Sequence, residues 1–548
     1  MTELRNKVVY QIYPKSFKDS NGDGFGDLRG IIEKLPYLEN LGIDMVWMNP
    51  FYVSPQNDNG YDIADYCAID PRFGTMADFE ELAAEAKKRG IGLMLDMVLN
   101  HTSTEHEWFK KALAGDKKYQ AYYYLRPAKE DGSLPTNWQS KFGGPAWQPF
   151  GDTDLYYMNL FDKTQADLDW HNPEVRKELY KVVNFWKDKG VTGFRFDVIN
   201  VTGKDELLID SINDVQEKSL YTDTPIVHDY LQEMNKATFG SDPNIMTVGE
   251  MSSTTIENCI LYTRPDRHEL SMAFSFHHLK VDYKDGDKWQ NQPFDFMQLK
   301  KILNDWQVGM DQGGGCNAVF WNNHDQPRAL TRFCDDKNYR VPAAKMLAHT
   351  IHMMKGVPYI YMGEEIGMTD PGWDTIERYK DIESINAYEK LRNKGLSKRE
   401  AMEVIMVKSR DNSRTPMQWD KSDYAGFSTV RPWIDVADNY TRLNVQNELE
   451  SGSIFSYYQD LIRLRKSMPI ISEGSYQPLL EENDRVFAYK RAYQGQELLV
   501  INNFYNEETT VTLPAGNFSY LLGNYGMRPY EQTLTLKPYE SLAFLSQA

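Results

Sequence analysis

Eight short apolar segments recur along the first two thirds of the chain, and each is followed by a longer segment with helical periodicity. The helical pattern is clearest in 79–89 and 173–190. Apolar segments of this kind indicate strands buried on both faces, as in a parallel sheet covered by helices. Eight alternating β and α units predict an α/β fold of the (β/α)8 TIM barrel type. The predicted strands lie in 8–14, 44–50, 92–101, 193–200, 245–251, 271–277, 318–325 and 358–367.

Two long segments interrupt this alternation. Roughly 70 residues rich in Trp, Tyr, Gly and Pro, 102–172, follow the third strand, and they are too many for a structureless barrel loop. We expect an inserted subdomain there, and a second insertion at about 369–430 on the same face. From 475 to 548 the chain alternates in short strand-like segments, which predicts a C-terminal antiparallel β-sandwich domain. The barrel should then consist of 1–101 and 173–474.

The charge balance narrows the possible partners. The 548 residues include 61 Lys and Arg against 79 Asp and Glu, a formal net charge of −18, which disfavours nucleic acid and anionic membranes. No segment approaches the roughly 18 apolar residues of a membrane helix, and Glu3, Arg5 and Lys7 break the pattern of a signal peptide. Four cysteines without C-x-x-C spacing suit a reducing compartment. We expect a cytoplasmic protein that is a monomer or a weak homo-oligomer.

Charged residues follow several predicted strands, at the end where a parallel barrel has its catalytic groups. Arg195 and Asp197 are two positions apart and therefore share one face of a strand. Glu250 ends a second strand, and His324 and Asp325 end a third. Three carboxylates on one rim are costly unless function requires them, because burial and mutual repulsion disfavour ionisation. A salt bridge at the rim is the alternative for Arg195 and Asp197 taken alone.

Glycoside hydrolysis requires two carboxyl groups with separated pKa values, one ionised as nucleophile and one protonated as acid. Arg195 beside Asp197 would keep that carboxylate charged. Glu250 lies on a neighbouring strand in a less cationic setting, which makes it the better candidate for the acid. The spacing therefore predicts Asp197 as the nucleophile and Glu250 as the acid, and we expect the two to act by a retaining double displacement.

The segments DMVLNH, GFRFDVIN, MTVGEM and WNNHDQPR resemble, in order and spacing, the four sequence blocks of the α-amylase superfamily of glycoside hydrolases. The resemblance covers essentially the whole chain. It implies Asp197 as the nucleophile and Glu250 as the general acid and base. It also implies that Asp325 binds sugar hydroxyls and stabilises the transition state.

The same resemblance implies a closed sugar site of the kind found in exo-acting glucosidases. Tyr61 would stack on the sugar ring, Asp62 would bind its far hydroxyls, and Arg414 would pair with Asp62. Simple packing is the alternative for Tyr61. The other residues implied to line the site are His101, Arg195 and His324.

A loop near the start, DSNGDGFGD, has oxygen ligands at alternate positions with glycines between them, as a hard cation such as calcium prefers. The loop departs from an EF-hand because Gly30 stands where the bidentate Glu would be. A turn-rich loop without a metal is the alternative. The resemblance implies a structural Ca²⁺ remote from the chemistry, and no cofactor for catalysis. The expected ligands are Asp19, Asn21, Asp23, the carbonyl of Phe25 and Asp27.

Two further stretches, 134–147 and 246–283, resemble members of the superfamily that split trehalose 6-phosphate into glucose and glucose 6-phosphate. A phosphate on the leaving group would need cations nearby. Lys280 and Lys288 are the expected contacts, although interleaved aspartates such as Asp282 also fit a solvated face. The same basic stretch includes His277, His278 and Lys284.

Three other functions stay open at this point. Val198, directly after the expected nucleophile, matches relatives that prefer α-1,6 links. An oligo-1,6-glucosidase or a sucrose-isomerising enzyme, acting on unphosphorylated sugars, is therefore the alternative to a phosphorylated disaccharide as substrate. A non-catalytic relative, such as the glycoprotein subunit of amino-acid transporters, would need a membrane helix and could lose the carboxylates, whereas all three are present here.

Overall fold

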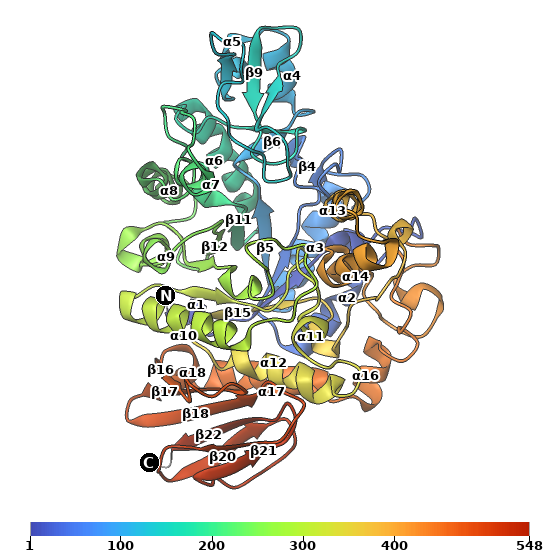
Figure 1. The fold of residues 1–548 in the computed structure, drawn as a ribbon, viewed down its shortest axis with the longest axis vertical. Coiled ribbons are helices and arrows are strands. Elements are labelled where there is room, and N and C mark those ends of the chain that lie inside the picture. Colours follow the sequence, from blue (N-terminus) through green and yellow to red (C-terminus); the bar gives the residue numbers. More distant parts are fainter. Residues whose placement is uncertain (1, 547–548) are drawn as a thin grey trace.

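The computed structural model describes residues 2–546, and its centre is a closed barrel of eight parallel strands (Figure 1). Neighbouring strands follow the order β1-β15-β14-β13-β12-β11-β5-β2, and pairing of β1 with β2 closes the ring. Every strand overlaps one of the eight segments predicted from the sequence, so the barrel is confirmed. The strands are β1 (Val9–Ile12), β2 (Met45–Met48), β5 (Gly92–Met97), β11 (Gly193–Phe196), β12 (Met246–Glu250), β13 (Met272–Phe274), β14 (Asn317–Val319) and β15 (Val357–Tyr361).

Helices surround the barrel and begin where the sequence provides caps. Thr75 and Asp78 form a reciprocal capping box at the start of α3 (Met76–Lys88). Pro173 opens α6 (Pro173–Asp188) at the first position, where its missing N–H leaves no hydrogen bond unmade. The other helices outside the inserted subdomain, apart from those of the segment that follows β15, are α1 (Thr2–Arg5), α2 (Leu28–Leu41), α7 (Asp214–Ser219), α8 (Pro225–Ala237), α9 (Ile256–Thr263), α10 (Phe296–Gly313), α11 (Ala329–Phe333), α12 (Arg340–His352), α16 (Val445–Ser451), α17 (Ile454–Ser467) and α18 (Pro469–Ser472); the short α15 (Asp411–Arg414) follows α14 (Lys398–Lys408) in the chain.

A small subdomain stands between β5 and α6, at the top of Figure 1. Its buried aromatic cluster includes Trp138 and Trp147 and continues into Val198 and Val201, which follow β11. The subdomain therefore packs directly against the loop that bears the expected nucleophile. Its elements are the sheet β7 (Leu125–Pro127), β9 (Leu155–Met158) and β8 (Trp147–Pro149), the pair β6 (His101–Ser103) and β10 (Gln165–Asp167), and the helices α4 (Glu107–Leu113) and α5 (Lys117–Gln120).

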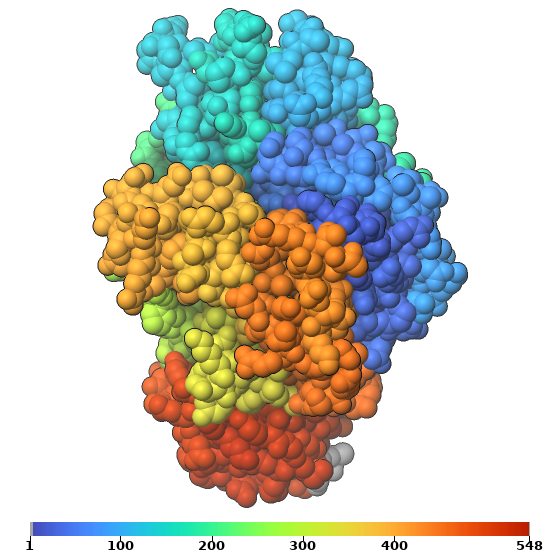
Figure 2. All heavy atoms as spheres, turned by 90° about the vertical axis from the view of Figure 1, so that its right-hand side faces the viewer, coloured from blue at the N-terminus to red at the C-terminus, as the bar shows by residue number. Residues whose placement is uncertain are grey.

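The segment after β15 forms a second projection on the barrel. It contains α13 (Ile382–Asn393) and α14 (Lys398–Lys408), which share an apolar cluster that includes Trp373, Tyr379 and Ile405. Figure 2 shows this segment in yellow and orange directly beneath the cyan inserted subdomain. A short pair, β3 (Tyr52–Val53) and β4 (Asp65–Ile69), follows β2.

The C-terminal domain is an antiparallel β structure below the barrel (Figure 1), as the sequence predicted. Its main sheet has the order β16-β17-β18-β22-β20, and β19 pairs with β21. Within residues 2–546, no helix has the length and apolar composition needed to cross a membrane. The strands are β16 (Ser475–Leu479), β17 (Val486–Tyr493), β18 (Gln496–Asn503), β19 (Thr509–Thr512), β20 (Phe518–Gly523), β21 (Thr533–Leu536) and β22 (Ser541–Ser546).

Two buried cations join this domain to the barrel. Arg491, on β17, donates to the carbonyl oxygens of Met353 and Ile471, both at 2.8 Å. Lys300, on α10, donates to the carbonyl oxygen of Leu480 at 2.8 Å. Both cations are almost completely buried. Each ammonium or guanidinium group thus satisfies its buried hydrogen-bond donors with backbone carbonyls, which avoids the cost of an unpaired buried cation.

Candidate active site

The carboxyl ends of three barrel strands bring acidic side chains onto one arginine. Arg195 Nη1 donates to Asp96 Oδ1 at 2.6 Å and to Asp197 Oδ1 at 2.7 Å. Its Nη2 donates to Glu250 Oε2 at 2.5 Å. Arg195 and Asp96 are almost fully buried, whereas the side chains of Asp197 and Glu250 are 11% and 13% exposed. Asp197 and Glu250 therefore lie on the side of the cluster that a sugar can reach.

Asp96 was missed by the sequence reasoning. It lies inside an apolar strand, β5, directly beside Arg195 in the register of β5 with β11. The sequence did contain a signal for Asp96, because it is the one acidic residue within the apolar segment 92–101. A charged side chain inside a buried strand needs a partner.

Burial separates the pKa values of the two reachable carboxyl groups. Burial raises the pKa of Glu250 to about 8, with Arg195 opposing the shift and the Asp197 carboxylate adding to it. Burial also raises the pKa of Asp197, to about 6, where Arg195 and a hydrogen bond from Glu250 limit the rise. Asp197 is thus mostly ionised and Glu250 mostly protonated at neutral pH, in the order expected. Glu250 is not in a less cationic setting, however, because Arg195 contacts both groups.

Val198 ties the turn after Asp197 to its surroundings. Its φ of 37° lies in the left-handed region, which is a genuine outlier for a β-branched residue. The Val198 N–H lies 3.3 Å from Glu250 Oε2, and the side chain belongs to the buried cluster of the inserted subdomain. Strain of this kind persists only where the surroundings fix it, and it is common at functional sites.

His324, which follows β14, is held in one tautomer beside Asp325. Its Nδ1 lies 3.1 Å from the amide nitrogens of both Gln11 and Asn49, so Nδ1 accepts and Nε2 bears the proton. Nε2 lies 3.3 Å from Asp325 Oδ2. Burial lowers the pKa of His324 to about 3, so the ring is neutral at physiological pH.

Two arginines that follow α14 keep Asp325 ionised. Arg414 Nη2 and Arg410 Nη1 lie 2.7 Å and 3.3 Å from Asp325 Oδ1. Burial would raise the pKa of Asp325, but the neighbouring Nε2–H of His324 and the charges of Arg410 and Arg414 hold it well below its usual range. Arg410 Nη2 also lies 2.6 Å from the buried carboxylate of Asp381. Arg410 and Asp381 are further polar members of the site that the sequence reasoning did not name.

Arg414 does not pair with Asp62, contrary to the expectation from the sequence. Its carboxylate partners within residues 2–546 are Asp325 and Asp381. Asp62 is fully buried, and it accepts hydrogen bonds from Ser54 Oγ at 3.0 Å and from the N–H of Asn57 at 2.9 Å. The Asp62 carboxylate is therefore occupied in bracing its own loop.

Asp58, in the same loop, is the acid that faces the arginines. Burial raises its pKa to about 7, and the charges of Arg410 and Asp325 act on it. Asp58 Oδ2 accepts a hydrogen bond from Gln165 at 3.1 Å, and the same Gln165 amide nitrogen lies 3.2 Å from His101 Nε2. His101 is almost fully buried, and the Gln165 amide thus links it to Asp58. Asp58, rather than Asp62, has the surroundings of a hydroxyl-binding acid.

One face of the Tyr61 ring is stacked on the ring of His324. Its ring lies 5.3 Å from that of His324 with an interplanar angle of 6°. The hydroxyl donates to Asp96 Oδ2 at 2.9 Å and accepts from Asn49 at 2.7 Å. Stacking of a sugar on Tyr61 stays a prediction.

Comparison with known proteins decides the family. Residues 11–474 match the family model described as the alpha amylase catalytic domain, and residues 486–542 match the one described as the alpha-amylase SusG C-terminal domain. This chain belongs to the alpha-amylase family. The resemblance inferred from the four sequence blocks is thereby confirmed.

Relatives of this alpha-amylase family enzyme extend over its full length. It is 52% identical to the trehalose-6-phosphate hydrolase of Bacillus subtilis (strain 168), covering 98% of this chain and 97% of that protein. It is 48% identical to the oligo-1,6-glucosidase of Bacillus cereus, covering 98% of each. The crystal structure of the Bacillus licheniformis trehalose-6-phosphate hydrolase superposes with a TM-score of 0.96 at 50% identity, over 99% of this chain and 100% of that one.

The two lysines expected to contact a phosphate lie in different settings of this enzyme. Lys288 Nζ lies 2.9 Å from Glu383 on α13. Lys280 is exposed and has no ion-pair partner in the part of the chain that the structure describes. Asp282 is not on a solvated face, because it is buried and lies 2.6 Å from Arg332. Buried charge pairing thus fixes the segment between the two lysines.

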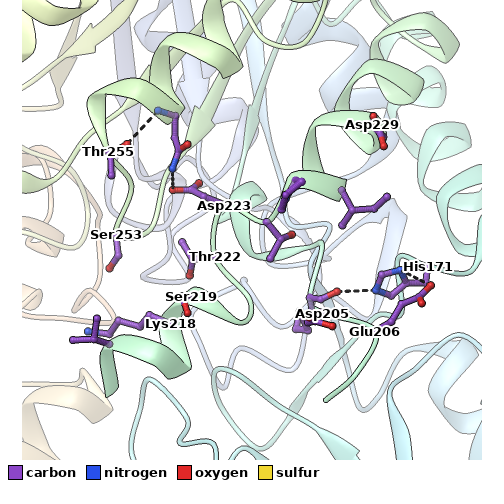
Figure 3. Close-up of a pocket in the computed structure, with 16 residues that line it drawn as sticks. His171, Asp205, Glu206, Lys218, Ser219, Thr222, Asp223, Asp229, Ser253 and Thr255 are labelled. Carbon is purple, nitrogen blue, oxygen red and sulfur yellow. Dashed lines mark hydrogen bonds and ion pairs between the residues drawn. The ribbon is translucent and has the colours of Figure 1, made fainter. Parts of the chain in front are cut away.

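Two pockets of this enzyme differ in how they relate to the catalytic carboxylates. One, of about 490 Å³, lies between the inserted subdomain and α13, and Arg410 connects it to Asp325. A wider pocket of about 1060 Å³, whose walls bear Asp205 and Lys218 (Figure 3), has neither Arg410 nor any of the three catalytic candidates in its lining. Because Arg410 pairs with Asp325, the first pocket is the one that leads toward the reaction centre. Its walls include Lys141, Phe142, Phe161, Trp289, Glu383 and Arg410.

The loop expected to bind calcium is ordered by its own side chains. Asp19 Oδ1 accepts the N–H of Gly22 at 2.7 Å, and Asp27 caps α2. Asn21 and Asp23 are exposed. Among residues 2–546, no three His, Cys, Asp or Glu side chains gather as a metal ion would require. A cation here would need amide and carbonyl oxygens to complete its shell.

Proposed function

We propose that this glycosidase hydrolyses trehalose 6-phosphate to glucose and glucose 6-phosphate with retention at the anomeric carbon. The observation that supports this chemistry best is the pair Asp197 and Glu250, which share Arg195 and differ in pKa by about two units. The substrate is supported by the full-length relatives that are named trehalose-6-phosphate hydrolase. A retaining enzyme needs just such a close pair of carboxyl groups.

In the first step Asp197 attacks the anomeric carbon while Glu250 donates its proton to the departing oxygen, so glucose 6-phosphate leaves and a glucosyl ester of Asp197 forms. In the second step the ionised Glu250 removes a proton from water. That water attacks the same carbon, releases glucose and restores both carboxyl groups. Asp325, kept ionised by Arg410 and Arg414, would bind sugar hydroxyls and stabilise the positive charge of the transition state.

Turnover of three disaccharides tests the substrate. We expect kcat/KM for trehalose 6-phosphate to exceed that for trehalose or isomaltose by about 100-fold, because a site built for a charged group strongly rejects substrates that lack it. Indifference to the phosphate would reject the proposal. A preference for isomaltose would favour the oligo-1,6-glucosidase alternative, which the 48% identity to the Bacillus cereus enzyme supports.

The pH profile should be bell-shaped. Asp197 must be ionised, so activity is lost as the pH falls through about 6, and Glu250 must be protonated, so activity is lost as the pH rises through about 8. The two limbs report on the interacting pair rather than on separate residues. The measurement is kcat/KM from about pH 4 to about pH 10 with an unphosphorylated chromogenic glucoside, which avoids titration of a substrate phosphate.

The variant Glu250→Gln tests the origin of the alkaline limb. Its amide has no proton to lose in this range, so the fall above about pH 8 should disappear while the acid limb stays. An unchanged alkaline limb would assign the proton to another group.

We also propose a structural calcium ion in the loop 19–27. Chelation with EDTA should lower the melting temperature by about 2–4 °C, and added calcium should restore it, because a ligand that binds only the folded state stabilises it. Asp23→Ala should abolish this response, whereas the exposed Asp152→Ala should not. Identical melting curves with EDTA and with calcium would contradict the proposal. Oxygen donors at alternate positions support it: Asp19, Asn21, Asp23, the carbonyl of Phe25 and Asp27.

We further propose that the enzyme acts in the cytoplasm, as a monomer or a weak homo-oligomer. The four cysteines, all free in the structure, and the net charge of −18 support this proposal. Cell fractionation and sedimentation of the purified protein test the two parts.

A further inference from the structure

One carboxylate oxygen in the pocket beside Asp325 is shared by two cations. Glu383 Oε2 lies 2.9 Å from Lys288 Nζ and 3.2 Å from Arg410 Nε. The Glu383 side chain is 30% exposed, whereas those of Lys288 and Arg410 are 16% and 9% exposed. Two cations from separate segments thus converge on an acid that is more exposed than either of them.

Arg410 connects this acid to the reaction centre. Its Nη1 lies 3.3 Å from Asp325 Oδ1, and both Arg410 and Glu383 line the pocket of about 490 Å³. Asp381 caps α13, and Glu383 follows in its first turn, where the helix dipole favours negative charge. The anion position at Glu383 is therefore separated by one guanidinium group from the carboxylate proposed to hold the sugar.

Building on the proposed function, we propose that Glu383 is an internal anion that occupies the phosphate subsite of the free enzyme, and that the substrate phosphate displaces it from Lys288 and Arg410. Near neutral pH a phosphate bears −1.5 to −2 charges and three acceptor oxygens. Glu383 presents a single charge, and one of its oxygens serves both cations. The two cations therefore gain charge and hydrogen bonds in the exchange.

The cations keep their positions without Glu383. Arg410 retains Asp381, which is fully buried and 2.6 Å away. The Lys288 ammonium lies 4.7 Å from the centre of the Trp289 ring, a cation–π contact. Glu383 is at the pocket surface and its carboxylate can turn into water. Competition from Glu383 thus weakens phosphate binding enough for glucose 6-phosphate to leave after each turnover.

Inorganic phosphate is the probe for this exchange. Its inhibition of the hydrolysis of p-nitrophenyl α-glucoside, an unphosphorylated substrate, reports on the subsite alone. Glu383→Gln should lower the inhibition constant of phosphate about tenfold, the size of one charge-assisted hydrogen bond. Glu389→Gln is the matched control, because Glu389 is exposed on the same helix, and it should leave the constant unchanged.

A second pair of variants tests the role of the shared cation. Lys288→Met should raise the inhibition constant about tenfold, because one cation of the subsite is lost. Glu383→Gln added to Lys288→Met should give a smaller gain than in the wild-type background, since residues that share a partner are not additive. Melting temperatures confirm that each variant folds.

An unchanged or higher inhibition constant in Glu383→Gln would overturn the internal-anion proposal, as would absence of phosphate inhibition in both that variant and the wild type. The proposed function fails separately. If wild-type enzyme turns over trehalose 6-phosphate no better than trehalose, the substrate is wrong. If the phosphorylated sugar is preferred but Glu383→Gln does not tighten phosphate binding, only the role of Glu383 is wrong.

Discussion

Asp197→Asn should lower kcat by about 10⁴-fold or more, because an amide cannot form the glucosyl ester of a retaining mechanism. The asparagine keeps the shape of the side chain and an oxygen for Arg195, so the fold should persist. A 2-fluoro glucoside, which slows the second step, should add one sugar to the wild-type protein at Asp197 and leave the variant unlabelled. Mass spectrometry of the intact protein and of its peptides measures both outcomes.

The control for this experiment is Asp154→Asn, an exposed aspartate of the inserted subdomain. It should be labelled and should turn over substrate as the wild type does. Full activity of Asp197→Asn, or a label on a different residue, would remove Asp197 from the role of nucleophile.

Arg195→Met should destabilise the fold by about 3–5 kcal/mol at neutral pH, the usual result of removing one partner from a buried ion cluster. Asp96, Asp197 and Glu250 would lose a shared donor while remaining buried. Burial already raises the pKa of Asp96 and of Asp197 to about 6 against the opposing effect of Arg195, and without the guanidinium both values should rise further. Near pH 5 both groups are then neutral, so the loss of stability should be smaller there. Urea unfolding at the two pH values measures the difference.

Arg399→Met provides the comparison for Arg195→Met. Arg399 is 86% exposed and lies 2.8 Å from Glu403 one helical turn away, so its removal should change stability by less than about 0.5 kcal/mol. An equal loss of stability for Arg195→Met at both pH values would show that the buried carboxylates do not depend on the guanidinium.

The barrel and three of the side chains at its rim could be predicted from the sequence because both depend on local patterns. Strands covered on both faces are mostly apolar, so β11 and β12 stand out from the helices between them. A charged residue that ends such a strand lies at the catalytic rim by the geometry of the fold alone. Arg195, Asp197 and Glu250 were identified in this way, and they meet as expected.

The rest of the site depends on contacts that no local pattern encodes. The loop DNGYD offers two acids, and only its turn geometry decides that backbone and Ser54 donors occupy Asp62 while Asp58 faces the arginines. The partner of Arg414 depends on how the segment around α13 folds over the barrel, which places Asp325 within its reach. Glu250 similarly owes its raised pKa to burial rather than to distance from Arg195.

The hydrogen bonds of Arg491 and Lys300 between the barrel and the C-terminal domain make this domain a poor candidate for exchange between relatives. Arg491 and Lys300 donate to backbone carbonyls across the boundary between the barrel and this domain. The contact therefore depends on the backbone path on both sides of the boundary, and the side chains of the acceptor residues take no part in it. A transplanted domain must therefore present its carbonyls in the same register, even if its sequence is otherwise compatible. Separating the two pieces at the boundary would remove the backbone acceptors of Lys300 and would leave Arg491 with the carbonyl of Ser475 on its own side, so each piece would expose a surface that the intact protein buries.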